Sequence, residues 1–231
     1  MKDKSGIIVF ARMGSKRFPG KVLQKINNIS NISYVISRAK KIFPGLKIVV
    51  ATTRLKADNK IEDYCKKNKI NFYRGNNLNV LIRAIKCCDK FKFTSFVRVC
   101  ADRIFFDYNL AKKMFKIFKK GNFDIVTNSF IKSFPKGLSC EILNLNILKK
   151  NYSKIKKKSH KEHICNYFYE NADNFAIKNI KSKHNSKIIN LSLALDTKED
   201  FVKIKNCYKH FSYRKLISTK KIKKYYIKKK L

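Results

Sequence analysis

The sequence predicts an α/β domain in which helices flank both faces of a mostly parallel sheet. Short continuous apolar runs recur along the first half of the chain, and such runs are typical of strands buried on both faces. Segments with helical apolar spacing alternate with these runs, which predicts βαβ units. The chain has 231 residues, of which 44% are hydrophobic, so it can bury the core of one such domain.

The alternation of strands and helices begins near the N-terminus and continues to Asn128. The first helix is predicted from apolar residues three and four positions apart, and it ends before Phe43-Pro44-Gly45. The later elements follow the same two patterns. The expected strands are Gly6–Ala11, Lys47–Thr53, Ile70–Tyr73, Phe93–Cys100 and Asp124–Asn128, and the expected helices are Ile32–Ile42, Asp58–Asn68, Val80–Cys88 and Tyr108–Lys120.

This rhythm changes after Asn128, where a turn at Phe134–Leu138 contains Pro135 and Gly137. We assign residues 1–210 to one domain, with residues 133–158 as a small β-containing excursion from it. The expected elements after the turn are a strand at Cys140–Leu143, a lysine-rich helix that ends near Lys158, helices at His160–Asn171 and Lys198–Tyr208, and extended segments at Phe175–Ile180 and Ile188–Leu195.

Residues 211–231 form a strongly basic C-terminal tail. From Arg214 onwards, lysines are mixed with apolar residues such as Ile222, Tyr225 and Tyr226. The pattern fits a terminal helix, an anchor for an anionic surface or a frayed end. We favour a frayed or weakly helical tail over an anchor.

The chain carries a very large positive charge, with 55 Lys and Arg against 15 Asp and Glu. Such a molecule attracts polyanions, so a nucleic-acid-binding module is one explanation. That class of protein should gather its basic residues on one face, with aromatic residues between them, whereas the lysines here are spread over nearly every expected helix. Lys, Asn, Ile, Phe and Tyr are abundant together while Pro and Gly are scarce, which favours codon drift. We therefore expect no specific nucleic-acid partner.

The cysteines and the hydropathy pattern indicate a cytoplasmic protein. Seven scattered cysteines form no CxxC pair, as expected of reduced thiols. The N-terminal residues lack the apolar core of a signal peptide, and no apolar run approaches the roughly 18 residues of a membrane span. We expect a soluble protein without a transmembrane segment.

A loop rich in glycine and basic residues follows the first expected strand. In open α/β sheets, ligands bind beyond the carboxyl ends of the strands. Gly14 and Gly20 allow backbone N–H groups to approach an anion closely. The spacing matches neither GxxxxGK[ST] nor GxGxxG, so the residues alone indicate a phosphate-binding loop, with a basic turn that holds no ligand as the alternative. The basic side chains of the loop are Arg12, Lys16, Arg17 and Lys21.

At these residues the sequence resembles a known family. ARMGSKRFPGKVL is similar to the ARxGSxRLPGKxL signature of the cytidylyltransferases that activate sugar acids as CMP-Kdo and CMP-sialic acid, and more closely to the spore coat polysaccharide biosynthesis protein F family. Similar blocks follow in family order over roughly residues 5–205. These blocks are IVVATT, RGNNLNVLIRA, VRVCADRIFFD, FPKGLSCEI, KEHICNYFYEN and LALDTKEDF.

The resemblance implies a Rossmann-like nucleotide-diphospho-sugar transferase fold of the GT-A type. It implies attack of a sugar hydroxyl on CTP, with Mg²⁺ as cofactor and release of pyrophosphate. The expected acceptor is a 2-keto sugar acid used in cell-surface polysaccharide or glycoconjugate biosynthesis. The resemblance also implies a homodimer, with Ser133–Lys158 reaching across the interface or towards the acceptor.

The resemblance assigns site residues in four groups. Those expected at the reacting phosphate are Arg12, Lys21 and Asp102, and those expected to hold the metal are Asp102 and Asp196. The nucleotide contacts are expected at Arg12, Gly14, Ser15, Arg17 and Lys21 for the phosphates, and at Thr52, Thr53, Arg74 and Gly75 for the base and ribose. The residues expected to face the acceptor are Lys136, Gly137, Glu141, Glu162 and His163.

Several of these residues have a second interpretation. Asp102 is also a candidate helix N-cap near Phe106–Tyr108, and Asp196, or its neighbour Thr197, is a candidate cap of the helix at Lys198–Tyr208. Glu141 lies among apolar residues, where a carboxylate has to be paired or bound to a ligand. His163 either orients a hydroxyl group or is a satisfied core histidine.

The sequence departs from the family pattern on the side expected to bind the acceptor. Each departure loses a charge or a rigid turn, while the loop and both aspartates persist. This indicates retained nucleotide binding and an altered acceptor. It leaves two alternatives, a catalytically weakened nucleotide-binding partner subunit and a glycosyltransferase on the same fold. The departing residues are Asn79, Arg103, Ile104, Ser139, Ser192 and Leu193.

Overall fold

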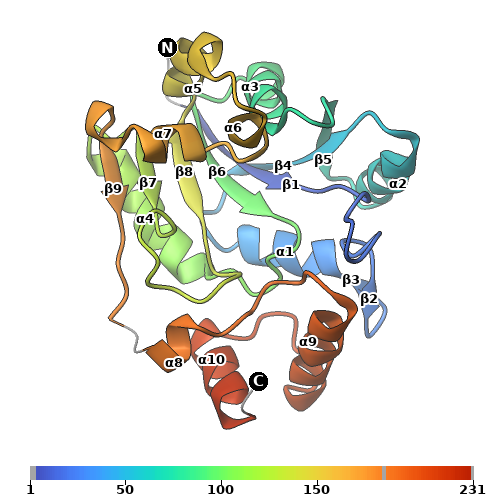
Figure 1. Ribbon diagram of the computed structural model, residues 1–231. Coiled ribbons are helices and arrows are strands. Elements are labelled where there is room, and N and C mark those ends of the chain that lie inside the picture. The colour runs from blue at the N-terminus through green and yellow to red at the C-terminus, as the bar shows by residue number, and fades with distance from the viewer. Residues whose placement is uncertain (1–3, 184–185, 230–231) are drawn as a thin grey trace.

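The computed structural model describes residues 4–183 and 186–229, and in these residues one sheet of seven strands forms the centre of the molecule (Figure 1). Its strands are β1 (Ser5–Phe10), β4 (Lys47–Thr53), β5 (Asn71–Gly75), β6 (Ser95–Cys100), β7 (Ile125–Thr127), β8 (Glu141–Asn144) and β9 (Ile177–Asn179). They lie in the order β5-β4-β1-β6-β8-β7-β9. Only β8 runs antiparallel to its neighbours among these strands. The predicted α/β fold with a mostly parallel sheet is therefore confirmed.

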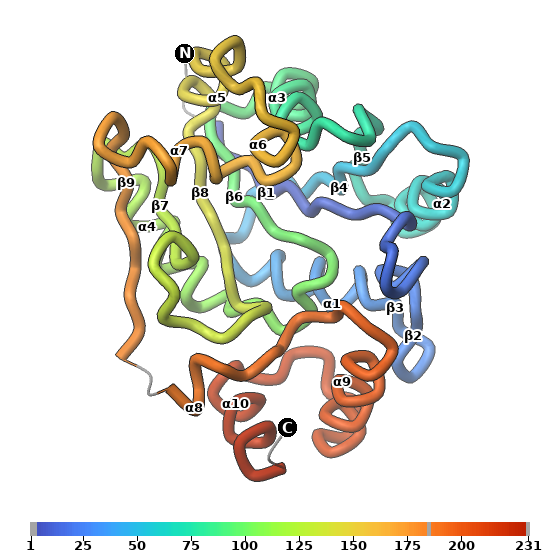
Figure 2. Tube along the Cα trace, viewed as in Figure 1, coloured from blue at the N-terminus to red at the C-terminus, as the bar shows by residue number. Residues whose placement is uncertain are grey.

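Helices cover the two faces of this sheet as two layers (Figures 1 and 2). The helices of the first layer are α1 (Asn31–Ala39), α2 (Asn59–Lys67), α4 (Tyr108–Lys120), α9 (Lys198–His210) and α10 (Thr219–Lys228), and those of the second layer are α3 (Val80–Phe91), α5 (Leu145–Asn151), α6 (Lys158–Glu162) and α7 (Asn166–Glu170). The short helix α8 (Ser186–Ile189) precedes α9, and a hairpin of β2 (Lys25–Ile26) and β3 (Ile29–Ser30) precedes α1.

The apolar runs form strands because both faces of the sheet are buried. In β1, Ile7 and Val9 pack into the first layer while Ile8 and Phe10 pack into the second. Successive side chains of a strand point to opposite faces, so a strand covered on both faces has to be apolar throughout. The carboxyl ends of β1, β4, β5 and β6 and the amino end of β8 then share one edge of the sheet.

Two helices of the second half are shorter than the sequence predicts. The lysine-rich helix ends at Asn151, and a 3₁₀ turn at Tyr152–Lys154 follows it instead of helix to Lys158. The helix expected over His160–Asn171 is divided, because the chain leaves helical geometry at His163 (φ −105°, ψ 87°). The break allows Ile164 and Phe168 to be fully buried on the second layer.

The extended segment predicted at Ile188–Leu195 is wrong. Helix α8 covers its start, and the rest is irregular apart from one bridge between Ser192 and Lys136. The alternating leucines of the segment reflect burial without a neighbouring strand along its length. These buried leucines are Leu191, Leu193 and Leu195.

The C-terminal tail forms a packed helix, so the terminal helix among the alternatives is confirmed and the frayed end is wrong. Tyr226 on α10 is buried, and its ring lies 6.1 Å from the ring of Phe105, edge to face. The buried Arg38 on α1 donates a hydrogen bond of 2.6 Å to the carbonyl oxygen of Ile217, which fixes the segment before α10. Figure 2 shows α10 beside α9, on the side of the molecule that carries α1.

All seven cysteines are free thiols, as predicted. Within the described ranges, no helix combines the length and the apolar character that crossing a bilayer requires.

Candidate active site

The N-terminal loop, residues 11–21, follows β1 at the carboxyl edge of the sheet. The backbone of Met13 organises it, because its carbonyl oxygen accepts hydrogen bonds from the N–H groups of Ser15 and Gly20, both at 2.9 Å. Gly20 has φ +70°, a left-handed conformation that favours glycine. Gly14 and Arg17 are exposed in this turn, as contacts to a ligand require.

A buried carboxylate that sequence reasoning missed fixes the loop to the end of β4. Asp58 accepts the backbone N–H of Met13 at 2.7 Å and that of Thr53 at 3.2 Å, and it is also hydrogen-bonded to the Thr53 hydroxyl. The sequence placed Asp58 only at the start of a helix. Its position close behind the second expected strand was the available signal.

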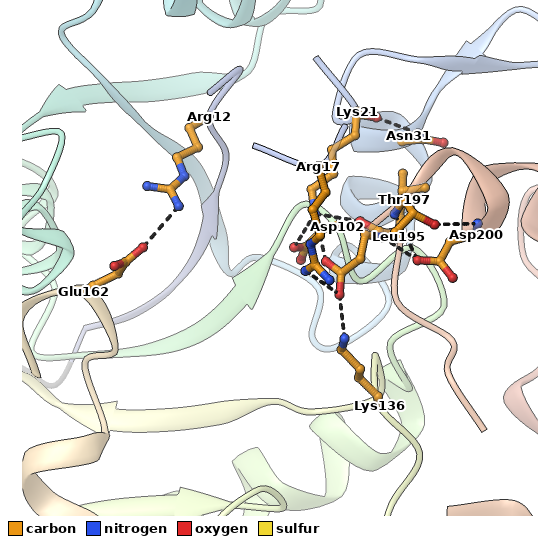
Figure 3. A network of polar contacts seen from close by, with 11 residues as sticks. Arg12, Arg17, Lys21, Asn31, Asp102, Lys136, Glu162, Leu195, Thr197 and Asp200 are labelled. Carbon is orange, nitrogen blue, oxygen red and sulfur yellow. Dashed lines mark hydrogen bonds and ion pairs between the residues drawn. The ribbon is translucent and has the colours of Figure 1, made fainter. Parts of the chain in front are cut away.

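Lys21 joins three distant parts of the chain. Its ammonium nitrogen donates to Asp102 Oδ2 at 3.0 Å, to Asp196 Oδ1 at 3.1 Å and to the carbonyl oxygen of Leu195 at 2.6 Å (Figure 3). Lys21 is 8% exposed, so these acceptors replace the water that would otherwise surround its ammonium group. The two aspartates expected from the sequence therefore do lie together, next to the expected lysine.

Asp196 is surrounded by cations. Its Oδ2 atom lies 3.1 Å from Arg17 Nη2 and 2.6 Å from Lys136 Nζ, in addition to the contact of Oδ1 with Lys21. Burial raises the pKa of Asp196, but the hydrogen bonds from Lys136 and Lys21 outweigh burial and lower its pKa to about 2. The carboxylate is thus fully ionised at neutral pH.

Neither aspartate caps a helix. Asp107 caps α4, because its Oδ1 atom accepts the N–H groups of Asn109 and Leu110 at 3.0 and 3.1 Å. Thr197 caps α9 in a capping box with Asp200. The capping interpretation is therefore wrong for both Asp102 and Asp196, and their carboxylates face the cluster of basic side chains.

Arg12 and Glu162 connect the N-terminal loop to α6. Arg12 Nη2 lies 3.1 Å from Glu162 Oε1, and both side chains are about half exposed (Figure 3). The next residue, His163, is exposed, so its interpretation as a core histidine is wrong. Among the histidines that the structure describes, His160 is the buried one, and its Nε2 lies 2.8 Å from a carboxylate oxygen of Glu170.

Lys136 reaches Asp196 from a turn whose backbone requires glycine at position 137. Gly137 has φ +96°, and a Cβ atom there would lie 2.5 Å from the carbonyl carbon of Leu193. The N–H group of Leu193 donates to the carbonyl oxygen of Lys136 at 2.8 Å. The turn is thereby packed against the segment that leads to Asp196.

Glu141 is paired inside the protein. Its Oε1 atom accepts hydrogen bonds from Arg98 at 3.0 Å and from the Ser129 hydroxyl at 3.2 Å, and Arg103 lies 3.7 Å from Oε2. Burial raises the pKa of Glu141, but the charges of Arg98 and Arg103 lower it by more, so the pKa lies below its ordinary value. Arg103 also donates to the carbonyl oxygen of Ser139 at 2.6 Å, so two departures from the family pattern touch each other.

Some of the residues expected around the base and ribose are buried or already make hydrogen bonds within the protein. Arg74 donates to the carbonyl oxygens of Thr53 and Leu55 and to the side chains of Asn59 and Glu62, all within 2.9 Å. Thr52 is fully buried. Gly75 instead borders a cavity of about 430 Å³, which Arg83 also lines. Arg83 was missed, although a charge on the apolar face of a predicted helix was a visible signal.

Asp102 and Asp196 suit a divalent cation. Both offer carboxylate oxygens, which Mg²⁺ prefers, and both lie within hydrogen-bonding distance of one ammonium nitrogen. In the part of the chain that the structure describes, no group of three or more His, Cys, Asp or Glu could hold a metal by itself. Two carboxylates fit a Mg²⁺ ion whose other ligands are water and phosphate oxygens.

Comparisons with known proteins identify the family of the chain. The family profile described as cytidylyltransferase matches residues 6–231. An uncharacterised protein of Methanocaldococcus jannaschii is 32% identical over 204 residues, which cover 88% of this chain and 83% of that protein. The spore coat polysaccharide biosynthesis protein SpsF of Bacillus subtilis is 27% identical over 222 residues, with 93% and 90% covered.

Solved structures give the same result for the fold. A cytidylyltransferase from Leptospira borgpetersenii superposes with a TM-score of 0.90 at 27% identity, covering 98% of this chain and 95% of its own. CMP:2-keto-3-deoxy-manno-octonic acid synthetase in complex with CTP superposes with a TM-score of 0.68 at 14% identity, covering 90% and 99%. The second likeness concerns the fold alone.

Proposed function

The chain belongs to the cytidylyltransferase family and is therefore a nucleotidyltransferase, and from this premise we propose that it transfers CMP from CTP to a sugar hydroxyl with release of pyrophosphate. The observation that carries the proposal is the cluster of Lys21, Asp102 and Asp196 beside the N-terminal loop. Cations for a triphosphate and carboxylates for a metal ion meet there, at the edge of the sheet where ligands of such folds bind.

The loop residues supply the groups that bind the triphosphate. The side chains of Arg12 and Arg17 are 44% and 62% exposed, so each can exchange its carboxylate partner for phosphate oxygens. Backbone N–H groups around Gly14 add further donors. Lys21 stays between the aspartates and lowers the cost of bringing a highly charged nucleotide next to them.

The proposed reaction is an in-line substitution at the α-phosphorus. The acceptor oxygen bonds to phosphorus and its proton passes to solvent, while the bond to the bridging oxygen of the β-phosphate breaks and pyrophosphate leaves. Asp102 and Asp196 would hold Mg²⁺, which neutralises charge on the phosphates. The protein contributes position and electrostatic stabilisation, which are the main requirements of phosphoryl transfer.

The proposed acceptor is a 2-keto sugar acid, bound on the side of Lys136 and Glu162. Support comes from Lys136, whose side chain is 59% exposed and can therefore pair with the carboxylate of an acceptor. The name of the Bacillus relative supports a role in polysaccharide or glycoconjugate biosynthesis. We extend the proposal to a cytoplasmic homodimer in which residues 133–158 lie at the interface.

Thermal-shift measurements test nucleotide binding directly. CTP with Mg²⁺ should raise the melting temperature more than UTP, ATP or GTP, and Asp102→Asn should remove the part that depends on Mg²⁺. Asp89→Asn serves as the matched control, because Asp89 pairs with Lys149 at the surface, away from the cluster. Equal stabilisation by every polyanion, heparin included, would show that binding depends on charge alone and would contradict the proposal.

A release assay for pyrophosphate tests catalysis. We expect release from CTP and Mg²⁺ only when a suitable sugar acid is present. Absence of release with every sugar acid tested, despite CTP binding, would favour a partner subunit. Transfer from a preformed nucleotide sugar without use of CTP would favour a glycosyltransferase instead.

A further inference from the structure

The cavity beside Gly75 has the size of a small-ligand site and an unusual electrostatic lining. It measures about 430 Å³ and lies at the carboxyl ends of β4 and β5, against the start of α3. Among the described residues that line it, three carry positive charge and none is a carboxylate. The cationic residues are Arg54, Arg83 and Lys86, and Tyr73 and Ile82 supply apolar wall.

Arg83 is the exceptional member of this lining. It is 3% exposed on the apolar face of α3, and none of the ion pairs among the described residues involves it. One Nη1 hydrogen bond of 2.8 Å goes to the carbonyl oxygen of Asn76, and the buried Nε has no partner. Burial and the nearby charge of Arg12 lower the pKa of Arg83 to about 10, so it remains charged at neutral pH.

A buried guanidinium without a carboxylate is costly unless other acceptors face it. An unsatisfied buried donor calls for an explanation, and the unmet donor capacity of Arg83 indicates an uncharged or anionic acceptor that enters the cavity. Arg74, which directly precedes Gly75 on β5, has no such capacity, because its guanidinium is bound to four protein acceptors.

The position of the cavity favours a nucleobase over a phosphate. Asp58 ties the N-terminal loop at Met13 to the end of β4 at Thr53, and β5 with the cavity is the next strand along the edge. A nucleotide whose phosphates lie on the loop can therefore place its base over β4 and β5. The ring of Tyr73 and the side chain of Ile82 suit a planar ring, and Leu55, 48% exposed, lies at the same cavity.

We propose that Arg83 is a specificity-determining residue that contacts the O2 and N3 edge of cytosine and thereby selects CTP over UTP. Arginine donates hydrogen bonds and accepts none. Cytosine presents two acceptors on that edge, O2 and N3, whereas N3 of uracil carries a hydrogen and would face another donor. The cationic lining thus favours cytosine and disfavours uracil. This inference rests on the proposed function and adds the residue that chooses the base.

The test compares CTP and UTP binding in three proteins. The wild type, Arg83→Gln and the control Arg214→Gln are titrated with each nucleotide in MgCl₂ by calorimetry. Arg214 is exposed and its replacement removes the same charge far from the cavity. We expect CTP affinity of Arg83→Gln to fall about tenfold or more while UTP affinity changes much less, so that the preference for CTP is lost. Arg214→Gln should keep the wild-type preference.

Further outcomes separate this inference from the proposed function. Should the wild type bind CTP and release pyrophosphate while Arg83→Gln keeps the CTP preference, the role of Arg83 is refuted and the function stands. Should the wild type bind neither nucleotide, the function itself fails. An equal loss of CTP, UTP and pyrophosphate binding in Arg83→Gln would assign Arg83 to phosphate and overturn the inference. If Arg83→Gln does not fold, Arg83→Lys serves, because it keeps the charge and loses the planar donor geometry.

Discussion

Replacing Lys21 by methionine should destabilise the protein far more than the same change at Lys136. Both lysines contact Asp196, but the side chain of Lys21 is 10% exposed and that of Lys136 is 59% exposed. Removing the ammonium of Lys21 leaves Asp102 and one oxygen of Asp196 without their buried partner, while Arg17 and Lys136 still reach the other oxygen. Breaking a buried ion pair costs about 3–5 kcal/mol, and the remaining cations place Lys21→Met at the low end, about 3 kcal/mol.

This loss is large enough to measure by thermal unfolding followed by circular dichroism. For a domain of this size, about 3 kcal/mol corresponds to a decrease in melting temperature of roughly 6–12 °C. Lys136→Met, which removes an exposed partner, should cost less than about 1 kcal/mol. Equal effects of the two substitutions would show that the burial of Lys21 does not control the stability of the cluster.

Magnesium provides a second measurement on the same variant. Without Lys21, Asp102 and Oδ1 of Asp196 lose the cation that they share, while Arg17 and Lys136 contact only Oδ2 of Asp196, so Mg²⁺ should bind the folded state and raise the melting temperature of Lys21→Met. The wild type should respond less, because its ammonium already satisfies both carboxylates. A variant that Mg²⁺ does not stabilise would contradict the assignment of Asp102 and Asp196 as metal ligands.

Three further predictions follow from contacts around the cluster. Asp58→Asn should weaken CTP binding about tenfold in calorimetry and lower stability by about 1–3 kcal/mol, because a buried amide can no longer accept all the hydrogen bonds that tie the loop to β4. The pKa of Asp196 falls from 3.8 in the unfolded chain to about 2 in the folded protein, so the ionised carboxylate stabilises the fold fully at pH values above 3.8. About 2 kcal/mol of unfolding free energy is lost as the pH falls through about 2, and acid titration of Asp196→Asn should lack this loss. Gly137→Ala should lower stability by about 1–3 kcal/mol in urea unfolding, since φ +96° and the backbone of Leu193 exclude a Cβ atom, and an unchanged midpoint would contradict the geometry.

The sheet could be predicted because its strands are apolar on both faces. Ile7, Ile8 and Val9 are all fully buried, and a continuous run of this kind in a short segment leaves few alternatives. The segment around Leu193 shows the limit of the method. Its alternating leucines are buried as expected, but a strand also needs a neighbouring backbone, which the sequence does not reveal.

The sequence could group the expected site residues that the resemblance assigns, but not the residues whose roles depend on contacts between distant elements. Lys21, Asp102 and Asp196 were expected together from the family resemblance, and the parallel sheet brings the ends of β1 and β6 to one edge, where the first two of these residues meet. Asp58 and Arg83 act through residues on other elements, so their roles depend on tertiary packing. The charge of Arg83 on an otherwise apolar helical face was visible in the sequence, but the cavity that it lines is formed by several elements and appears only in the structure.

The packing of α10 has a practical consequence for shortened forms of the protein. Proteolysis or a stop codon ahead of Thr219 would remove Tyr225 and Tyr226 and would expose the rings that they now cover, including Phe105. A newly bared aromatic surface promotes self-association, and here it would sit beside many lysines that bind other polyanions without specificity. Trimming this basic end to improve behaviour in solution should therefore cause aggregation.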